Sequence, residues 1–322
     1  VIFFDGKLKV FKVLYKGLAC VLFAFAAPVI AFEFVVLGDM PYGDEPVIEE
    51  QYRKLIEHVN QENPDFVIHL GDTKSGSTLC SDEFYTRQKA LFSIFTAPLL
   101  YTPGDNEWTD CHRSNNGGYD PLDRLKMLRQ VVFDDSYFEQ SALLGLQSQG
   151  ALMREFSEFI ENQMWISSGT LFLLIHVVGS NNNMDSGTSI GEREFLLREK
   201  ANQHWIHRAF DLLQEDRIHD LVVVFHGDPF VDWMMPQPSL MYSGFLETVG
   251  TTLFEKAKTT DKKILFIHGD THQYTWNHPF FAAGHLRGNV SRLVVPGAGD
   301  MRAVKISIQR ESEDYYILDM IE

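Results

Sequence analysis

The sequence predicts an α/β fold with a parallel sheet, and two observations support this. Five short apolar runs each stop at a Gly-Asp pair, and these pairs end at Asp39, Asp72, Asp105, Asp228 and Asp270. The runs are rich in β-branched and aromatic residues, as strands buried on both faces are, whereas Asp and Gly favour loops. Helical segments separate the first three runs, and this alternation is typical of βαβ units.

The first half of the predicted sheet comes from three of these runs. FEFVVLGD is the first strand, and a helix follows from about Glu45 to Asn60, where apolar residues recur at helical spacing. DFVIHLGD is the second strand, residues 81–95 form a helix, and PLLYTPGD is the third strand. Each strand therefore delivers one carboxylate to the loop that follows it.

The second half begins after a less regular segment. Residues 107–168 contain the turn-rich sequence SNNGGYDP and are a candidate cap insertion beside the site. TLFLLIHVVGSNNN is a further strand, residues 191–215 form a helix, and LVVVFHGD and ILFIHGD are two strands separated by a helix around Gly244 to Lys258. Three β segments close the chain, the last two as a hairpin. No low-complexity linker interrupts it, so residues 32–322 are predicted to form a single domain.

Residues 1–31 have the pattern of a secretory signal peptide. Four lysines precede an apolar stretch from Gly17 to Ala31, and Val29 and Ala31 occupy the −3 and −1 positions of a cleavage site. The stretch of about 15 residues is short for a membrane span, which needs about 20. We therefore expect a secreted or periplasmic protein with no stable membrane contact after cleavage; an uncleaved anchor is the alternative.

Two cysteines lie beyond residue 31, Cys80 and Cys111, each several residues after a strand-end Asp. In an oxidising compartment such a pair is more often bonded than free, so we predict a Cys80–Cys111 disulfide. This bond would join two loops of the site. Two separate buried thiols are the alternative.

The net charge argues against a nucleic-acid partner. The chain carries −16 at pH 7, and residues 1–31 contribute +3, which leaves −19 for residues 32–322. Such an acidic surface disfavours binding to a polyanionic backbone, although solubility alone also accounts for the charge. The sequence carries no signal for an oligomeric state.

The strand ends bring acids and histidines to one edge of the predicted sheet. Because ligands of open α/β sheets bind at the carboxyl ends of strands, the five Asp residues should lie near one another, with His226, His268 and His272 alongside. A cluster of carboxylates and imidazoles suits a pair of divalent metal ions. A single Gly-Asp turn carries little weight, so the inference depends on the ordered set.

In order and spacing, these segments resemble the calcineurin-like metallophosphoesterase superfamily over about residues 34–275. That pattern is D-x-H, G-D, G-N-H-D/E, a lone His and G-H-x-H, each at a strand end. The matching segments are Gly38-Asp39-Met40-Pro41, Gly71-Asp72, Gly104-Asp105-Asn106-Glu107, His226 and Gly269-Asp270-Thr271-His272. The resemblance implies a four-layer α/β/β/α sandwich with a metal site at the carboxyl ends of the strands.

The resemblance also implies which residues hold the two metal ions. Six residues stand at the positions of the family's metal ligands: Asp39, Asp72, Asp105, His226, Asp270 and His272. In the family, the counterpart of Asp72 bridges both ions. Asp105 stands where the family has Asn, and Asp270 stands where it has His, but both can coordinate a cation.

Two departures concern other family histidines. Pro41 occupies the His position of D-x-H and has no side-chain ligand atom, so Tyr42 or Asp44 is the candidate substitute. Asn106 stands where the family has a His that stabilises charge and protonates the leaving group. We assign Asn106 to phosphoryl binding, and His112, six residues further on, is the candidate proton donor.

The function implied by the resemblance is a secreted or periplasmic phosphoesterase that hydrolyses phosphate mono- or diesters of small molecules through a metal-activated hydroxide. Two divalent ions are the expected cofactors. The oxygen-rich ligand set suits Mn²⁺, Mg²⁺ or Ca²⁺, with Fe and Zn also open. Histidine is missing from three family positions, at Pro41, Asn106 and Asp270. This loss motivates the alternative, a non-catalytic metal- or ligand-binding protein on the same scaffold.

Overall fold

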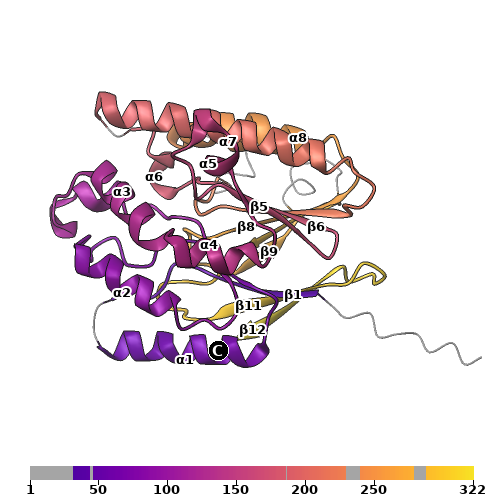
Figure 1. Ribbon diagram of the computed structural model, residues 1–322, viewed down its shortest axis with the longest axis horizontal. Helices are drawn as coiled ribbons and strands as arrows, with labels where there is room; N and C mark the ends of the chain where they lie inside the picture. Colours follow the sequence, from indigo (N-terminus) through magenta and orange to yellow (C-terminus); the bar gives the residue numbers. More distant parts are fainter. Residues whose placement is uncertain (1–31, 44–45, 186, 230–239, 279–287) are drawn as a thin grey trace, which may run out of the picture. The chain divides into compact units, whose positions relative to one another are not determined.

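Two β-sheets form the centre of the protein in the computed structural model (Figure 1). The structure describes residues 32–43, 46–185, 187–229, 240–278 and 288–322. These residues belong to one compact unit, Phe32–Glu322, and the predicted signal peptide lies outside them. Within the described part of the chain, no helix is long and apolar enough to cross a membrane.

The first sheet holds five strands in the order β12-β11-β1-β2-β3. Their bounds are β1 Phe32–Leu37, β2 Val67–His69, β3 Leu99–Tyr101, β11 Ala303–Ile308 and β12 Tyr316–Ile321. Strands β1, β2 and β3 run parallel, so the Gly-Asp pairs that follow them lie at the same edge. Strand β11 pairs antiparallel with both β1 and β12, which confirms the predicted hairpin.

The second sheet holds seven strands in the order β4-β5-β6-β7-β8-β10-β9. Their bounds are β4 Gln147–Ser148, β5 Gln163–Ser167, β6 Thr170–Leu174, β7 Asp220–Val224, β8 Lys263–His268, β9 Thr275–Asn277 and β10 Val290–Val294. Strands β6, β7, β8 and β10 run parallel, while β4, β5 and β9 pair antiparallel with their neighbours. The loops after β7 and β8 therefore leave the sheet at one edge.

The α-helices are α1 Pro46–Glu62, α2 Asp82–Phe92, α3 Pro121–Val132, α4 Asp135–Ala142, α5 Gln149–Leu152, α6 Gly179–Asn182, α7 Ser189–Leu212 and α8 Glu255–Ala257. The short 3₁₀ segments are η1 Thr109–His112, η2 Ser114–Asn116, η3 Arg154–Phe156 and η4 Leu240–Phe245. Helices α1, α2 and α7 correspond to the three helices expected near residues 45–60, 81–95 and 191–215. The helix expected near residues 244–258 instead begins as a π-helix, η5 Leu246–Phe254. Here the Thr252 hydroxyl donates to Glu247 O, 2.8 Å away, and such side-chain bonds compete with the α-helical ladder.

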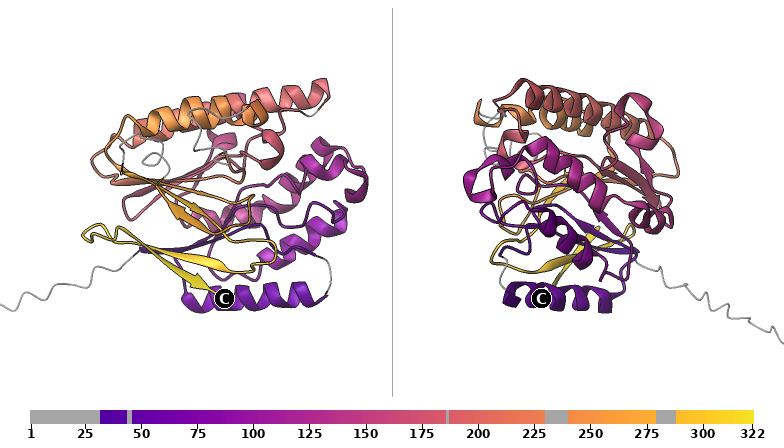
Figure 2. Two further views of the ribbon diagram at one scale, coloured as in Figure 1. Left: turned by 180° about the vertical axis from the view of Figure 1, so that it is seen from behind. Right: turned by 60° about the vertical axis from the view of Figure 1, so that its left-hand side comes forward.

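Side-chain packing arranges these elements in four layers (Figures 1 and 2). The inner faces of the two sheets share one apolar core, which includes Phe34, Phe66, Trp165 and Phe172. Helices α7 and η5 pack on the outer face of the second sheet, and α1, α2 and α3 pack on the outer face of the first. The α/β class is thus confirmed, with one helical layer outside each sheet.

Residues 107–168 contribute to these layers. Side chains of α3 and α4 join the core on the outer face of the first sheet, and β5 pairs with β6 in the second sheet. That this segment also acts as a cap over the site stays a prediction.

We expect Phe172→Ala to lower the free energy of unfolding by about 3–5 kcal/mol, because it leaves a cavity in the core between the sheets. Phe172 is fully buried and its ring lies 4.8–5.9 Å from those of Phe32, Phe34, Phe66 and Trp165. Urea unfolding measures the change, and Leu143→Ala, at a side chain that is 81% exposed, is the matched control. A loss below about 1 kcal/mol in Phe172→Ala would contradict this account of the core.

Candidate metal centre

The loops at the carboxyl ends of five strands bring the six predicted ligands together. Asp39, Asp72 and Asp105 follow β1, β2 and β3, and His226 follows β7. The loop after β8 carries both Asp270 and His272. One site is therefore assembled from both sheets.

Two groups of potential ligand atoms lie within this cluster. Asp39, Asp72 and His272 each offer an atom within 4.8 Å of the others, and so do Asp72, Asp105 and His226. In the first group, His272 Nε2 lies 3.7 Å from Asp39 Oδ1. In the second, His226 Nε2 lies 3.2 Å from Asp105 Oδ1 and 3.4 Å from Asp72 Oδ1. Each group has the size and chemistry to hold one divalent cation.

Asp72 belongs to both groups, and its two oxygens face different neighbours. Oδ1 lies near His226, as above, and also accepts from Asn106 N, 3.0 Å away. Oδ2 accepts from the Tyr42 hydroxyl at 2.7 Å and from Asn106 Nδ2 at 2.5 Å. A carboxylate placed in this way is suited to bridge two cations.

Asp270 lies between the two groups and is a member of neither. Its Oδ1 is 4.0 Å from His226 Nε2, and its backbone N–H donates to the Asp39 carboxylate. Its Oδ2 accepts from Asp228 N at 3.1 Å. The structure therefore places Asp270 at the edge of the second group, where coordination through Oδ1 stays a prediction.

Tyr42, a candidate substitute for the missing His at Pro41, lies against the first group. Its hydroxyl lies 3.0 Å from His272 Nε2 in addition to its bond to Asp72, and its ring meets the His272 ring edge-on at 5.1 Å. The sequence signal was only that Tyr42 follows Asp39 by three residues. Asp44, the other candidate substitute, lies outside the described residues.

The two residues that the sequence assigned to catalysis, Asn106 and His112, differ in burial and in their contacts. Asn106 is buried and donates from Nδ2 to both Asp72 and Tyr42, the latter at 3.1 Å. His112 is exposed, and its Nδ1 lies 2.7 Å from Thr109 O. Among the described residues, the hydrogen bonds of His112 do not reach the ligand cluster. The role of His112 as proton donor stays a prediction.

His268 and Asp228 form a neighbouring polar pair outside both groups. The buried His268 ring stacks on Phe225 at 5.5 Å, and Nε2 lies 3.7 Å from Asp228 Oδ1. Arg292 Nη1 also lies 3.5 Å from Asp228 Oδ1. The pair helps to position the loop after β8, because Asp228 N donates a hydrogen bond to Asp270 Oδ2.

Four of the predicted ligands adopt left-handed backbone conformations. The φ angles are 54° at Asp39, 51° at Asp72, 72° at Asp270 and 61° at His272. Each such residue costs on the order of 1–3 kcal/mol and persists only where the surroundings enforce it. Such a concentration of left-handed residues is typical of functional sites.

Burial, with mutual repulsion adding to it, raises the pKa values of three of the four carboxylates. Burial raises the pKa of Asp39 to about 8, with the charges of Asp270 and Asp105 adding to the effect. Burial also raises the pKa of Asp72 well above its ordinary range and that of Asp270 to about 6. For Asp105, burial is outweighed by hydrogen bonds from His226 and Ser180 together with the His226 charge, so its pKa falls to about 2.

The pKa of His226 is determined by the neighbouring charges against the effect of burial. Burial lowers its pKa, but the surrounding carboxylates, Asp72 first, outweigh burial and raise it well above the ordinary value. Within the protein alone, an imidazolium therefore compensates part of the negative charge. Among the described residues, the four carboxylates have only this one imidazolium close by, so the cluster suits a pair of divalent cations. Binding of the cations would displace the protons that the carboxylates hold.

A left-handed turn supports the second group. Residues Ser180, Asn181, Asn182 and Asn183 have φ between 50° and 58°. The turn brings the Ser180 hydroxyl to Asp105 Oδ2 at 2.6 Å and to Asp110 Oδ1 at 3.2 Å. Asp105 Oδ1 then remains directed toward His226.

Buried polar contacts hold this turn in place. Asn181 Oδ1 accepts from Gly244 N at 2.8 Å, and Asn182 Nδ2 donates to Glu199 Oε1 at 2.9 Å. The fully buried Arg198 donates to both the side chain and the backbone carbonyl of Asn182. These bonds offset the cost of about 1–2 kcal/mol for each left-handed residue.

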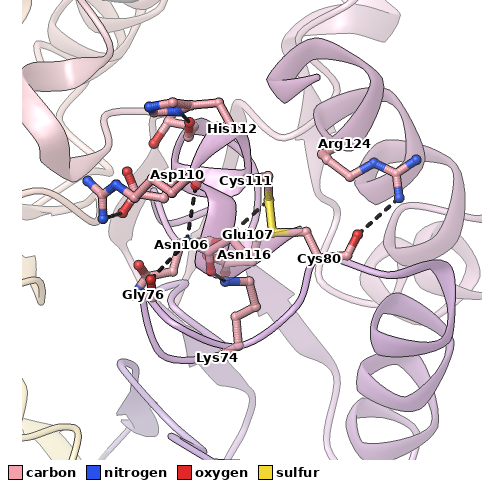
Figure 3. The surroundings of a disulfide bond; sticks show 12 residues. Lys74, Gly76, Cys80, Asn106, Glu107, Asp110, Cys111, His112, Asn116 and Arg124 are labelled. Carbon is pink, nitrogen blue, oxygen red and sulfur yellow. Dashed lines mark hydrogen bonds and ion pairs between the residues drawn. A yellow bond between two sulfur atoms is a disulfide. The ribbon is translucent and has the colours of Figure 1, made fainter. Parts of the chain in front are cut away.

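A disulfide joins two loops of the site, as predicted (Figure 3). The sulfur atoms of Cys80 and Cys111 are 1.94 Å apart, and both cysteines are buried. These sulfur atoms lie 3.6 and 3.7 Å from Asn106 O, so the bond packs directly against the backbone of a site residue.

Residues 32–274 match the sequence profile of the calcineurin-like phosphoesterases. No curated protein matches the chain.

Solved structures cover most of the chain at low identity. A dimetal phosphatase from Danio rerio is 11% identical, with a TM-score of 0.48 and coverage of 90% of this chain and 99% of that chain. GAP50, the anchor in the inner membrane complex of Plasmodium, is 12% identical, with a TM-score of 0.48 and coverage of 91% and 89%. A purple acid phosphatase from yellow lupin seeds is 12% identical, with a TM-score of 0.47 and coverage of 90% and 51%.

In metal-chelated protein, we expect Asp39→Asn to raise the melting temperature at pH 8 and to leave it unchanged at pH 4. The folded-state pKa of Asp39 is raised to about 8 from an ordinary value of 3.8. The folded state therefore loses stability as pH rises from about 4 to 8, and the neutral amide avoids this loss. Differential scanning fluorimetry in EDTA at both pH values measures the effect, and an equal difference at pH 4 and pH 8 would contradict it.

We expect Gly179→Ala to weaken binding of one metal ion by about tenfold or more, as changes to groups that orient metal ligands do. A Cβ at this position would lie 2.7 Å from Asp270 Oδ1 and 2.8 Å from Asp105 Oδ1, so the carboxylates must move. Mn²⁺ titration by calorimetry measures the affinity. Gly299→Ala is the control, because a Cβ there meets nothing within 4 Å. Equal affinities in the two variants would refute the steric argument.

Proposed function

Because the chain belongs to the calcineurin-like phosphoesterase family, we propose that it is a metal-dependent hydrolase of phosphate mono- or diesters. The observation that carries this proposal is the pair of ligand groups that share Asp72. Two divalent cations held by these groups would activate water and stabilise the attacking and leaving oxygens of phosphoester hydrolysis.

The chain supplies a ligand set for each cation in this proposal. Asp39, Asp72, His272 and Tyr42 surround the first position, and Asp72, Asp105 and His226 surround the second. When bound, the cations would activate water as the nucleophile and neutralise charge on the phosphoryl oxygens. Asp270 would complete the second set from its edge.

Residues around the ligands would orient the substrate. Asn106 Nδ2 is a hydrogen-bond donor beside Asp72 and Tyr42, so it is placed to hold a phosphoryl oxygen. Ser180 holds Asp105 Oδ2 and thereby sets the oxygen that faces His226. We retain His112 as the candidate proton donor to the leaving group. This role requires the exposed His112 side chain to extend toward the substrate.

We further propose a small-molecule phosphoester substrate and a secreted or periplasmic location. The Cys80–Cys111 disulfide supports an oxidising compartment, since such bonds are rare in reducing ones. The acidic sequence continues to argue against nucleic acid.

The alternative is a non-catalytic binding protein, favoured by Pro41 and Asn106 at positions where the family has His. Two measurements on one sample separate the two functions. Elemental analysis gives the metal content, and assays with p-nitrophenyl phosphate and its bis-ester, with and without Mn²⁺, give the activity and the ester class. About two metal ions with turnover support the enzyme, whereas no metal-dependent turnover supports the binding protein.

We expect Asp72→Asn to abolish turnover and to reduce bound metal from about two ions to at most one, because both groups lose a shared ligand. Circular dichroism should show an intact fold. Asp211→Asn, at an exposed position of α7, is the control and should behave as the wild type. Unchanged turnover in Asp72→Asn would exclude this site as the catalytic centre.

A further inference from the structure

We propose that Arg113 is a substrate-binding residue whose guanidinium holds the phosphoryl group beside Asn106. This inference rests on the proposed phosphoesterase function and adds to it a specific contact with the anionic substrate. It assigns a role to a residue that stands next to the predicted proton donor, His112.

Arg113 and Asn106 border the same point of the site. A Cβ built on Gly76 would lie 3.0 Å from Asn106 Oδ1 and 3.7 Å from Arg113 Nη1. Asn106 in turn contacts Asp72, the residue that both ligand groups share. Figure 3 shows Gly76, Asn106 and Asp110 on one side of the disulfide, with Arg124 on the other. The guanidinium of Arg113 is therefore at the Asn106 side of the metal centre.

A chain of polar contacts connects Arg113 to a ligand of the second group. Its Nη1 forms an ion pair with Asp110 Oδ2 at 2.5 Å. Asp110 Oδ1 accepts from the Ser180 hydroxyl, which also contacts Asp105 Oδ2. The position of the guanidinium is thus set by the same residues that set Asp105.

The backbone of Arg113 is also held firmly. Its N–H donates to Asp110 O at 3.0 Å, and its carbonyl accepts from Asn116 N at 2.9 Å and from Gly118 N at 3.0 Å. Cys111, two residues earlier, is bonded to Cys80. A fixed backbone with a long side chain gives a cation that can reach a ligand without reordering the loop.

Arg113 differs from the neighbouring cations Lys74 and Arg124 in its accessibility. Its side chain is 44% exposed, whereas that of its partner Asp110 is 4% exposed. Lys74 is buried and donates to Ser75 O and to Asn116 Oδ1, and Arg124 donates to Cys80 O and to Asp82. Within the described residues, the Arg113 hydrogen bonds leave Nε and Nη2 for a further acceptor. A guanidinium can donate two parallel hydrogen bonds to a phosphate.

The charge of the ligand set explains why an additional cation matters here. Asp39, Asp72, Asp105 and Asp270 carry four negative charges when ionised, which two divalent ions only neutralise. A phosphate dianion at such a site gains from a further charged hydrogen-bond donor. Asn106 is neutral where the family has His, and Arg113 keeps Nε and Nη2 for this role beside its ion pair with Asp110.

The test measures binding of inorganic phosphate to Mn²⁺-loaded protein by calorimetry, with metal content determined for each sample. We compare wild type with Arg113→Gln, Arg113→Lys and the control Arg154→Gln, which removes an exposed arginine of η3. The loss of a charged hydrogen-bond donor should weaken phosphate binding in Arg113→Gln by about tenfold or more at unchanged metal content. Arg113→Lys should retain part of the affinity, and Arg154→Gln should match the wild type.

Three results would overturn the inference. Equal phosphate affinity in Arg113→Gln and wild type would show that Arg113 does not contact the phosphoryl group. A loss of affinity that follows a loss of metal would show that Arg113 acts only through Asp110 on the ligands. A wild type that binds Mn²⁺ but no phosphate would overturn the proposed function and this inference together, so the two failures are distinguishable.

Discussion

The crowding of four carboxylates, three of them buried and Asp270 partly exposed, is the constraint on which the rest of this structure depends. Asp39, Asp72, Asp105 and Asp270 meet at the carboxyl ends of strands from two sheets. Burial raises the pKa of three of them, and His226 supplies positive charge against the fourth. Bound cations would favour the ionised form of this cluster, so the crowding of the carboxylates and the proposed chemistry are linked.

The loops must approach very closely to build this cluster, and two glycines permit the approach. A Cβ on Gly104 would lie 2.1 Å from Asp72 Oδ1, and one on Gly269 would lie 2.3 Å from Asp39 Oδ2. The ligand residues themselves take left-handed φ angles that cost energy. Rigid parallel strands and the aromatic core between the sheets offset this cost, since they fix where each loop begins.

Polar groups outside the cluster determine how the side chains of the candidate ligands are oriented. The turn at Ser180–Asn183 directs one oxygen of Asp105, and buried Arg198 and Glu199 hold that turn. On the other side, the disulfide and the Asp110–Arg113 ion pair fix the segment that carries Asn106. The second ligand group is therefore supported from α7 and from the disulfide-linked loops at once.

The sequence by itself determined the α/β class, the strand ends and the cysteine pair, because each depends on local composition and order, while the resemblance to a known family selected the six candidate ligands. A Gly-Asp pair after a buried strand is visible in one segment, wherever that segment lies. Only the tertiary structure decided that Asp72 belongs to two ligand groups, that Tyr42 contacts His272 of the first, and that Asp270 stands at an edge. It also decided that Arg113 lies near Asn106, while the His112 side chain is exposed and contacts Thr109 O. The physical reason is that distances between loops of different strands depend on sheet register and packing, which no single segment encodes.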